Sequence, residues 1–174
     1  AATGMDALTH NVESYLSPAY HPLCDGIALE GVRIAARALP VAVRDGANLP
    51  ARADMLMSSM MGAIAFQKDL GAVHSCAHAL STVADLHHGL ANGVMIDHVM
   101  RFNLPAATAR MAELARVCGA GASAADIVAR LGHLKGEVGI PARLGVAGVK
   151  TTSTLLHASS KSRLIKVRIF WART

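Results

Sequence analysis

Aromatic side chains are scarce in this chain of 174 residues: Phe, Trp and Tyr together make up only 3% of it. Sandwiches and barrels rely on aromatic and β-branched side chains in their strands, so this scarcity argues against an all-β fold. Hydrophobic residues still account for 52% of the chain, which is ample for a continuous core, and Ala, Leu and Met are frequent among them. We therefore predict an all-α fold, and the length is that of one domain.

Cysteines are few. Cys24, Cys76 and Cys118 are an odd number, lie far apart and form no CxxC pair. This pattern argues against a disulfide framework and against a thiolate zinc site, and it is typical of a reducing compartment. We predict a cytoplasmic protein.

Long hydrophobic runs are also absent. No apolar run reaches the roughly 18 to 20 residues that a membrane span needs. The N-terminus lacks the basic and then apolar segments of a signal peptide. We expect a soluble chain with no membrane partner.

Acidic residues are missing from the end of the chain. Residues 150–174 hold six Lys and Arg and no Asp or Glu, whereas residues 1–149 hold 11 basic and 12 acidic residues. The formal charge of +5 therefore comes from the tail, and the body is near neutral. Nucleic acid is not expected as a partner, because only the charge of the tail would favour it. We predict a helical domain over 1–149 and an atypical basic tail over 150–174.

Apolar residues recur at helical spacing through the body of the chain. Pro22 fits the first turn of a helix, and Pro40 is expected to end that helix. Gly119 and Gly132 are expected to end two later helices. The predicted helices cover about residues 6–16, 22–40, 50–66, a short stretch before a turn at 85–87, and then 88–102, 106–117 and 124–131.

Histidines and one aspartate stand at the spacing of metal ligands. Asp6 and His10 are four residues apart, so they share one face of the first predicted helix. Four more histidines fall within fifteen residues: His74, His78, His87 and His88. Burying such groups unpaired would cost several kcal/mol each, whereas imidazoles and a carboxylate together bind zinc or iron(II) well. We predict that they share one divalent metal ion.

The remaining histidines have no partner at such spacing. We expect them to be ordinary core or surface residues. They are His21, His98, His133 and His157.

Two runs of the sequence resemble the C-terminal domain of the iron-containing (group III) alcohol dehydrogenases. They are TGMDALTHNVESYLSPAYHPLCDGIALEG and MGAIAFQKDLGAVHSCAHALSTVADLHHGLANGVMIDHVMRFN. The resemblance covers about residues 2–149. It implies a helical bundle that corresponds to the C-terminal domain of a dehydroquinate synthase-like, iron-containing alcohol dehydrogenase fold.

The resemblance also implies roles for single residues. Asp6 and His10 of the first run, and His74 and His88 of the second, fall on the four family ligands of one Fe(II) or Zn(II) ion. His78 falls on a histidine that is often assigned to proton relay, and it is the expected catalytic residue. The implied reaction is the NAD(P)-dependent interconversion of a small-molecule alcohol and its aldehyde, with the metal acting as a Lewis acid.

Features of the family are missing from this chain. Its dinucleotide-binding domain, with a glycine-rich phosphate loop, precedes the first motif, and this chain begins almost on that motif. The tightest glycine pair, Gly119 and Gly121, follows a predicted helix rather than a strand, so no residue is predicted to bind the cofactor. We expect NAD(P) to bind only the full-length enzyme and the isolated chain to be inactive. The expected partner is the missing dinucleotide-binding domain, or further copies of this chain in a homo-oligomer.

Some positions depart from the family pattern. Ala79 and Ser81 stand where Pro and Gly are usual, and Asp69 stands where Gly is common, which indicates a different substrate pocket. Phe66 and the apolar residues around Gly71 are weak candidates to line that pocket. The resemblance stops near residues 148–150, and we interpret the basic tail as the product of a frameshift or cloning junction, with a natural tail as the alternative.

Two other functions stay open at this point. A helical metal-dependent phosphohydrolase also builds its site from His and Asp, but it usually shows a His-Asp dipeptide, which this chain lacks. A non-catalytic fragment that binds metal or self-associates is the second alternative, because removing a partner domain uncovers apolar surface.

Overall fold

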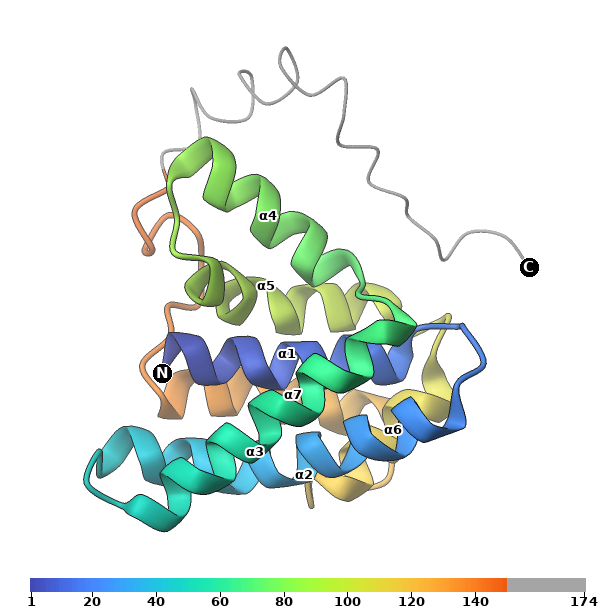
Figure 1. The fold of residues 1–174 in the computed structure, drawn as a ribbon. Helices are drawn as coiled ribbons and strands as arrows, with labels where there is room; N and C mark the ends of the chain where they lie inside the picture. Colours follow the sequence, from blue (N-terminus) through green and yellow to red (C-terminus); the bar gives the residue numbers. More distant parts are fainter. Residues whose placement is uncertain (150–174) are drawn as a thin grey trace.

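The computed structural model describes residues 1–149 of the chain. These residues form seven α-helices and one short 3-10 helix, with no strand among them (Figure 1). The elements are α1 (Ala2–Leu16), α2 (Pro22–Arg44), α3 (Leu49–Ala65), η1 (Phe66–Lys68), α4 (Ala72–Ala84), α5 (His88–Asn103), α6 (Thr108–Val117) and α7 (Ala124–Glu137). The predicted all-α fold is confirmed, and the predicted basic tail lies outside the described residues. Within residues 1–149, no helix combines the length and the apolar character that crossing a membrane requires.

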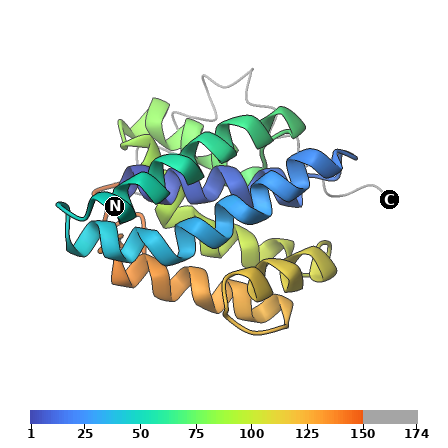
Figure 2. The ribbon, with the colours of Figure 1, turned by 60° about the horizontal axis from the view of Figure 1, so that its bottom comes forward.

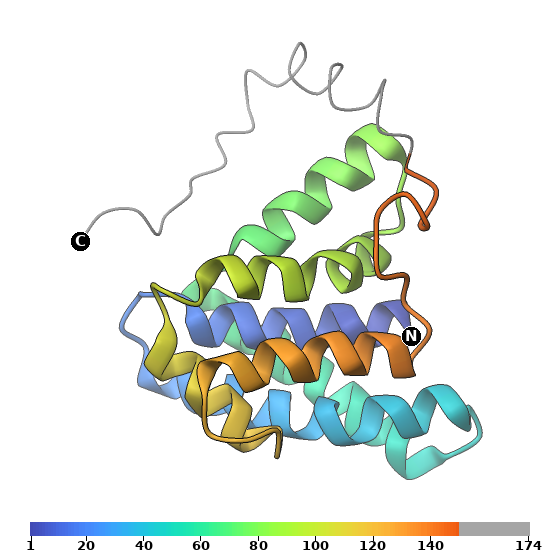
Figure 3. The ribbon, with the colours of Figure 1, turned by 180° about the vertical axis from the view of Figure 1, so that it is seen from behind.

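Helix α1 lies at the centre of the bundle. It packs against α2 and α3 on one side and α5 on the other (Figures 1 and 3). Met5, Leu8 and Val12 recur at helical spacing along it and are fully buried. Burying each such side chain contributes about 1.5–3 kcal/mol. The helix that carries Asp6 and His10 is therefore anchored in the core.

Helices α2 and α3 lie side by side along their lengths (Figure 2). Helix α2 begins at Pro22 as predicted, but the prediction that it ends at Pro40 was wrong, because the helix continues to Arg44. A proline inside a helix removes one backbone hydrogen bond and costs about 3 kcal/mol. The adjacent Leu39 is buried, and the long contact with α3 outweighs that local cost.

Helix α7 packs against α5 and α6 (Figure 3). The prediction that Gly132 ends it was wrong, because α7 runs on to Glu137 with Leu131 and Leu134 both buried in the core. Gly119 does follow the end of α6, where it adopts a left-handed φ of +63°. Gly119 thus ends its helix as predicted, whereas the packing of Leu131 and Leu134 in the core continues α7 past Gly132.

Helices α4 and α5 bring the second histidine cluster to α1. Helix α4 packs mainly against α5 and projects from the rest of the bundle (Figures 1 and 3). A turn separates the two helices, as predicted, with Asp85 in a left-handed conformation at φ +51°. Helix α5 begins at His88, also as predicted, and the ring of His87 caps it by accepting a hydrogen bond from the backbone N of Leu90 at 3.3 Å.

Candidate metal centre

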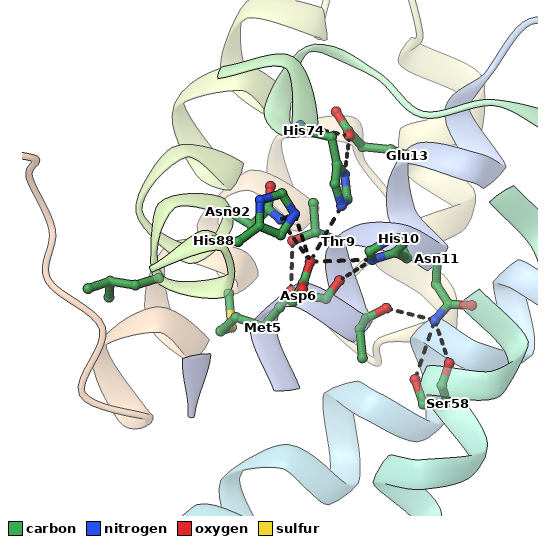
Figure 4. Close-up of polar contacts among 12 residues, drawn as sticks. Met5, Asp6, Thr9, His10, Asn11, Glu13, Ser58, His74, His88 and Asn92 are labelled. Atoms are coloured by element: carbon green, nitrogen blue, oxygen red, sulfur yellow. Dashed lines mark hydrogen bonds and ion pairs between the residues drawn. The ribbon is translucent and has the colours of Figure 1, made fainter. Parts of the chain in front are cut away.

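The predicted ligands come from three helices that meet at one place. Asp6 and His10 lie one turn apart on α1, His74 lies in the first turn of α4, and His88 is the first residue of α5 (Figure 4). Residues some 80 positions apart in the sequence thus face one another because α4 and α5 both begin beside α1.

The carboxylate of Asp6 is at the centre of this group. Its Oδ1 lies 3.3 Å from Nδ1 of His10, 3.4 Å from Nε2 of His74 and 3.8 Å from Nε2 of His88. The ring centroids of His10 and His74 are 4.2 Å apart, and those of His74 and His88 are 5.5 Å apart. The three predicted histidine ligands therefore surround one oxygen atom of the fourth predicted ligand, Asp6.

Three of the four predicted ligands lie close enough together to bind one ion. One ligand atom from each of Asp6, His74 and His88 lies within 4.8 Å of the others, a separation that one cation can bridge. His10 lies beside them but is not among these three, and its Nδ1 is 3.0 Å from the backbone O of Asp6. The assignment of His10 as a fourth ligand stays a prediction.

The donor set fits a divalent metal ion. Nε2 of His74 is buried and has no hydrogen-bond partner, and the side chain is only 4% exposed. Nε2 lies 3.4 Å from Oδ1 of Asp6, so either a proton on His74 or a bound cation at this place would satisfy both atoms. One carboxylate with imidazoles is the kind of set that Fe(II) and Zn(II) accept.

Charges within the site are strongly coupled. Burial raises the pKa of the Asp6 carboxyl, but its contacts with His10 and His74 outweigh burial and hold that pKa well below its usual range. Burial lowers the pKa of His74, but the carboxylates of Asp6 and Glu13 outweigh it and raise this pKa to about 9. Burial lowers the pKa of His88, and the neighbouring imidazoles add to this effect. A metal ion must therefore compete with a proton held at His74.

Glu13 is a residue of this site that the sequence analysis missed. It is 3% exposed, and its Oε2 accepts hydrogen bonds from the backbone N of His74 at 3.1 Å and from Nδ1 of its ring at 2.8 Å (Figure 4). Its Oε1 accepts one from the backbone N of Val73 at 2.7 Å. Its spacing was a usable signal, because Glu13 follows Asp6 by seven residues and His10 by three, which places it on the same face of α1.

Asn92 is the second missed residue. Its Nδ2 donates a hydrogen bond to Oδ1 of Asp6 at 2.8 Å and lies 3.1 Å from Nε2 of His88. The side chain is fully buried, and its Oδ1 has no hydrogen-bond partner. Asn92 follows His88 by four residues on α5, so the signal was again helical spacing.

His78, the predicted proton relay, lies at the edge of the group. It is one turn after His74 on α4 and is exposed to solvent. Its ring centroid lies 5.0 Å from that of His88 and 6.4 Å from that of His74. It is therefore accessible to solvent and lies closer to His88 than to His74.

The other histidines lie outside the group. His87 caps α5, Nδ1 of His21 accepts a hydrogen bond at the start of α2, Nε2 of His98 lies 3.2 Å from the backbone O of Ala142, and His133 is exposed beside Glu137. His157 lies outside the described residues.

The residues predicted to line a substrate pocket lie in two different places. The ring of Phe66 lies 6.2 Å from that of His10 and is part of the border of the metal group. Gly71 instead lines a cavity of about 580 Å³ between the end of α1, the start of α4 and the second half of α5. Glu13 lines this cavity too, whereas Asp6, His74 and His88 do not. The cavity is thus a neighbour of the metal group and does not contain it.

Comparison with known proteins places this geometry in a family. The family model "Fe-containing alcohol dehydrogenase family, C-terminal" matches residues 1–162, a range that extends into the predicted basic tail. The chain belongs to this family. Since the family is one of iron-containing alcohol dehydrogenases, the match favours the dehydrogenase over the phosphohydrolase alternative.

Several characterised relatives are similar over most of the chain. The 1,3-propanediol dehydrogenase of Klebsiella pneumoniae is 42% identical over 158 residues, which is 86% of this chain and 41% of the relative. The 4-hydroxybutyrate dehydrogenase of Cupriavidus necator is 41% identical over the same shares. A solved 1,3-propanediol oxidoreductase superposes with a TM-score of 0.83 at 42% identity and covers 86% of this chain and 41% of its own. The chain thus spans about two fifths of the length of these relatives.

Proposed function

We propose that this chain supplies the metal-binding part of an alcohol dehydrogenase, with Asp6, His10, His74 and His88 as the ligands of one Fe(II) or Zn(II) ion. The observation that carries the proposal is the buried Nε2 of His74, which has no hydrogen-bond partner and faces the carboxylate of Asp6. The family supports the metal and the reaction class, since its relatives are alcohol dehydrogenases.

The chemistry divides between the ion and the chain. When bound, a divalent ion supplies Lewis acidity, which lowers the pKa of an alcohol hydroxyl and polarises an aldehyde carbonyl. Asp6 contributes the negative charge that attracts the cation, and Asn92 holds its Oδ1 in place. His78 is exposed at the edge of the group, where its ring can pass a hydroxyl proton to solvent.

The hydride acceptor must come from outside the described residues. We propose NAD(P), bound by the part of the family that this chain does not cover, and a small alcohol or aldehyde as substrate. One relative is named as an NAD-dependent methanol dehydrogenase, at 36% identity over 167 residues. The proposal includes the expectation that the isolated chain is inactive, because residues 1–149 contain no strand and so no strand–loop–helix unit of the kind that binds a dinucleotide.

Metal analysis tests the site directly. The purified chain should carry about one Fe or Zn per molecule, and His74→Ala should lose most of it while keeping its helical circular dichroism. His133→Ala is the control, because His133 is exposed and remote from the group. Equal metal content in wild type and His74→Ala would refute the site.

A fusion tests the reaction. The part of the Klebsiella pneumoniae relative that precedes its matched region would be joined to residue 1 of this chain. We expect NAD-dependent oxidation of a small alcohol by the fusion, and its loss in the His74→Ala version. A fusion that folds and binds one metal ion but oxidises no alcohol would favour a non-catalytic metal-binding fragment instead.

One observation keeps self-association as a second candidate. Helix α3 exposes a row of large apolar side chains, among them Leu49, Leu56 and Met60, which are 51–74% exposed. Exposed apolar rows of this kind favour homo-oligomers. Light scattering of the purified chain tests this, and a monomer at all concentrations would exclude it.

A further inference from the structure

Glu13 is held in an unusual position for an ionisable side chain. Its carboxylate is buried between α1 and the start of α4, and every group that bonds to it is an N–H donor. Two of these donors are backbone N–H groups in the first turn of α4, where a helix has no partners of its own. The residue before α4, Gly71, provides no side-chain cap. Glu13 therefore caps α4 from another helix, and the negative charge suits the N-terminal end of the helix dipole.

The same carboxylate fixes the ring of His74. A carboxylate can only accept hydrogen bonds, so the ring nitrogen that faces it, Nδ1, must carry a hydrogen. In the neutral ring the lone pair is then on Nε2, the atom that faces Asp6. Position and tautomer of the His74 ring are thus both set by Glu13.

Gly71 makes this contact possible. A Cβ atom at this position would lie 2.6 Å from Oε1 of Glu13 and 3.1 Å from its Cδ. Real Cβ atoms do not approach so closely, so any larger residue would push the carboxylate away from α4. Glycine at position 71 therefore lets the carboxylate of Glu13 approach the start of α4 closely.

We propose that Glu13 is a positioning residue of the metal centre: by holding the Nδ1–H tautomer of His74, it keeps Nε2 available as a metal ligand. The inference rests on the proposed metal site and deepens it, because it assigns a residue that is not itself a ligand. Partners of this kind orient metal-binding histidines, and their loss typically weakens metal affinity 10- to 100-fold.

The variant Glu13→Gln keeps the size of the side chain and replaces one hydrogen-bond acceptor with a donor. If the new amide nitrogen faces His74, the ring must place its proton on Nε2, where it blocks metal binding. If the amide oxygen faces His74 instead, the amide nitrogen meets the backbone N–H of Val73, and two donors repel. In the first arrangement Nε2 is blocked and the amide nitrogen also meets the backbone N–H of His74. In the second, the repulsion at Val73 displaces the side chain that positions the His74 ring, although the side chain keeps its size.

Co(II) titration of the full chain is the test, followed by visible absorption. Wild type should bind one Co(II), and Glu13→Gln should bind 10- to 100-fold more weakly. Its Co(II) spectrum should approach that of His74→Ala, since in both variants His74 no longer contributes its normal nitrogen. Weaker binding with the band positions of wild type would instead reflect the lost charge alone, and it would overturn the role of Glu13.

Asp25→Asn is the matched control. It also removes one carboxylate charge that joins separate elements, but Asp25 bonds to Lys68 and Arg110 rather than to a predicted ligand. It should lower the melting temperature and keep the wild-type Co(II) affinity and spectrum. Should Glu13→Gln fail to fold, Gly71→Ala displaces the same carboxylate without changing its charge, and it should weaken Co(II) binding in the same direction.

The outcomes separate the two proposals. Folded Glu13→Gln, or folded Gly71→Ala where the former does not fold, with wild-type affinity and spectrum overturns the role of Glu13, while wild type and His74→Ala still test the metal site. If wild type itself binds no Co(II), the metal site and the role of Glu13 both fall.

Discussion

Nε2 of His74 lies 3.4 Å from Oδ1 of Asp6. Each of the two side chains also makes a hydrogen bond with a residue that is not a predicted ligand. Glu13 accepts a hydrogen bond from Nδ1 of His74 at 2.8 Å, and Asn92 donates one to Oδ1 of Asp6 at 2.8 Å. Two of the atoms proposed to bind a metal ion therefore face each other, each with a further hydrogen-bond partner on its side chain. Without a metal ion, Asp6 and His74 pair a carboxylate with a protonated imidazole, and the pair controls how the site responds to pH.

Metal affinity should depend steeply on pH. The pKa of His74 is raised to about 9, so at neutral pH a metal ion must displace a proton from its ring. The apparent Zn(II) affinity should fall about tenfold for each unit of pH below 9, because one proton is released per ion bound. Calorimetric titrations in buffers of different ionisation enthalpy would count the protons. An affinity that is constant from pH 7 to 9 would contradict the prediction.

The free energy of unfolding of the metal-free chain should change with pH in the opposite direction, falling as pH rises. The pKa of His74 lies above its usual value of 6.5, so protonation stabilises the folded state below about pH 6.5, and this contribution is lost as pH rises through 9. The urea midpoint of the metal-free chain should therefore fall between pH 6.5 and 9. His74→Ala, measured over the same range, supplies the background from all other groups. Parallel curves for wild type and His74→Ala would show that no such linkage exists.

Local patterns in the sequence were enough for part of this site. The spacing of Asp6 and His10 predicted a shared helix face, and the family motif indicated His74 and His88. Helical spacing puts Glu13 on the face of Asp6 and His10, and Asn92 one turn after His88. It could not predict the hydrogen bonds of Glu13 to His74 or of Asn92 to Asp6, because those bonds join helices that meet only in the folded chain. For example, Glu13 bonds to residues 60 positions away, at the start of a helix that was predicted only as a short stretch.

Two errors in the helix boundaries have one physical cause. Pro40 and Gly132 were expected to end their helices because both residues disfavour helix interiors. In the structure the helices run past both, and buried neighbours such as Leu39 and Leu134 provide the packing that outweighs the local preference. Propensity is a property of a few residues, whereas packing depends on the whole bundle.

Gly89→Ala should damage the metal centre through the backbone. A Cβ atom at Gly89 would lie 2.6 Å from the backbone O of Ala2 and 3.3 Å from Cβ of Asp6, so α5 would have to move away from α1. Such overpacking costs about 1–3 kcal/mol in the free energy of unfolding, and metal affinity should fall with it because His88 moves away from Asp6. Urea unfolding and Co(II) titration would measure the two effects.

The control for this variant is Gly26→Ala. Gly26 is exposed inside α2, and a Cβ atom there would meet nothing within 4 Å. It should stabilise the chain by about 0.4–1 kcal/mol, because alanine loses less backbone entropy on folding, and it should leave Co(II) affinity unchanged. Equal stability changes for the two substitutions would mean that α1 and α5 do not pack as closely as described.

His78→Ala should separate proton transfer from metal binding. The His78 ring is exposed and its centroid lies 5.0 Å from that of His88, but His78 is not among the three residues whose ligand atoms lie within 4.8 Å of one another. The variant should keep the metal content of wild type. In the fusion with the Klebsiella pneumoniae relative it should lower the rate of alcohol oxidation about 100-fold or more, as expected for the loss of a general acid–base group. Added imidazole should restore part of that rate, because it can carry the proton that the missing ring no longer carries. Metal analysis and rate measurements with and without imidazole test both parts, and a variant that loses its metal would show instead that His78 is a ligand.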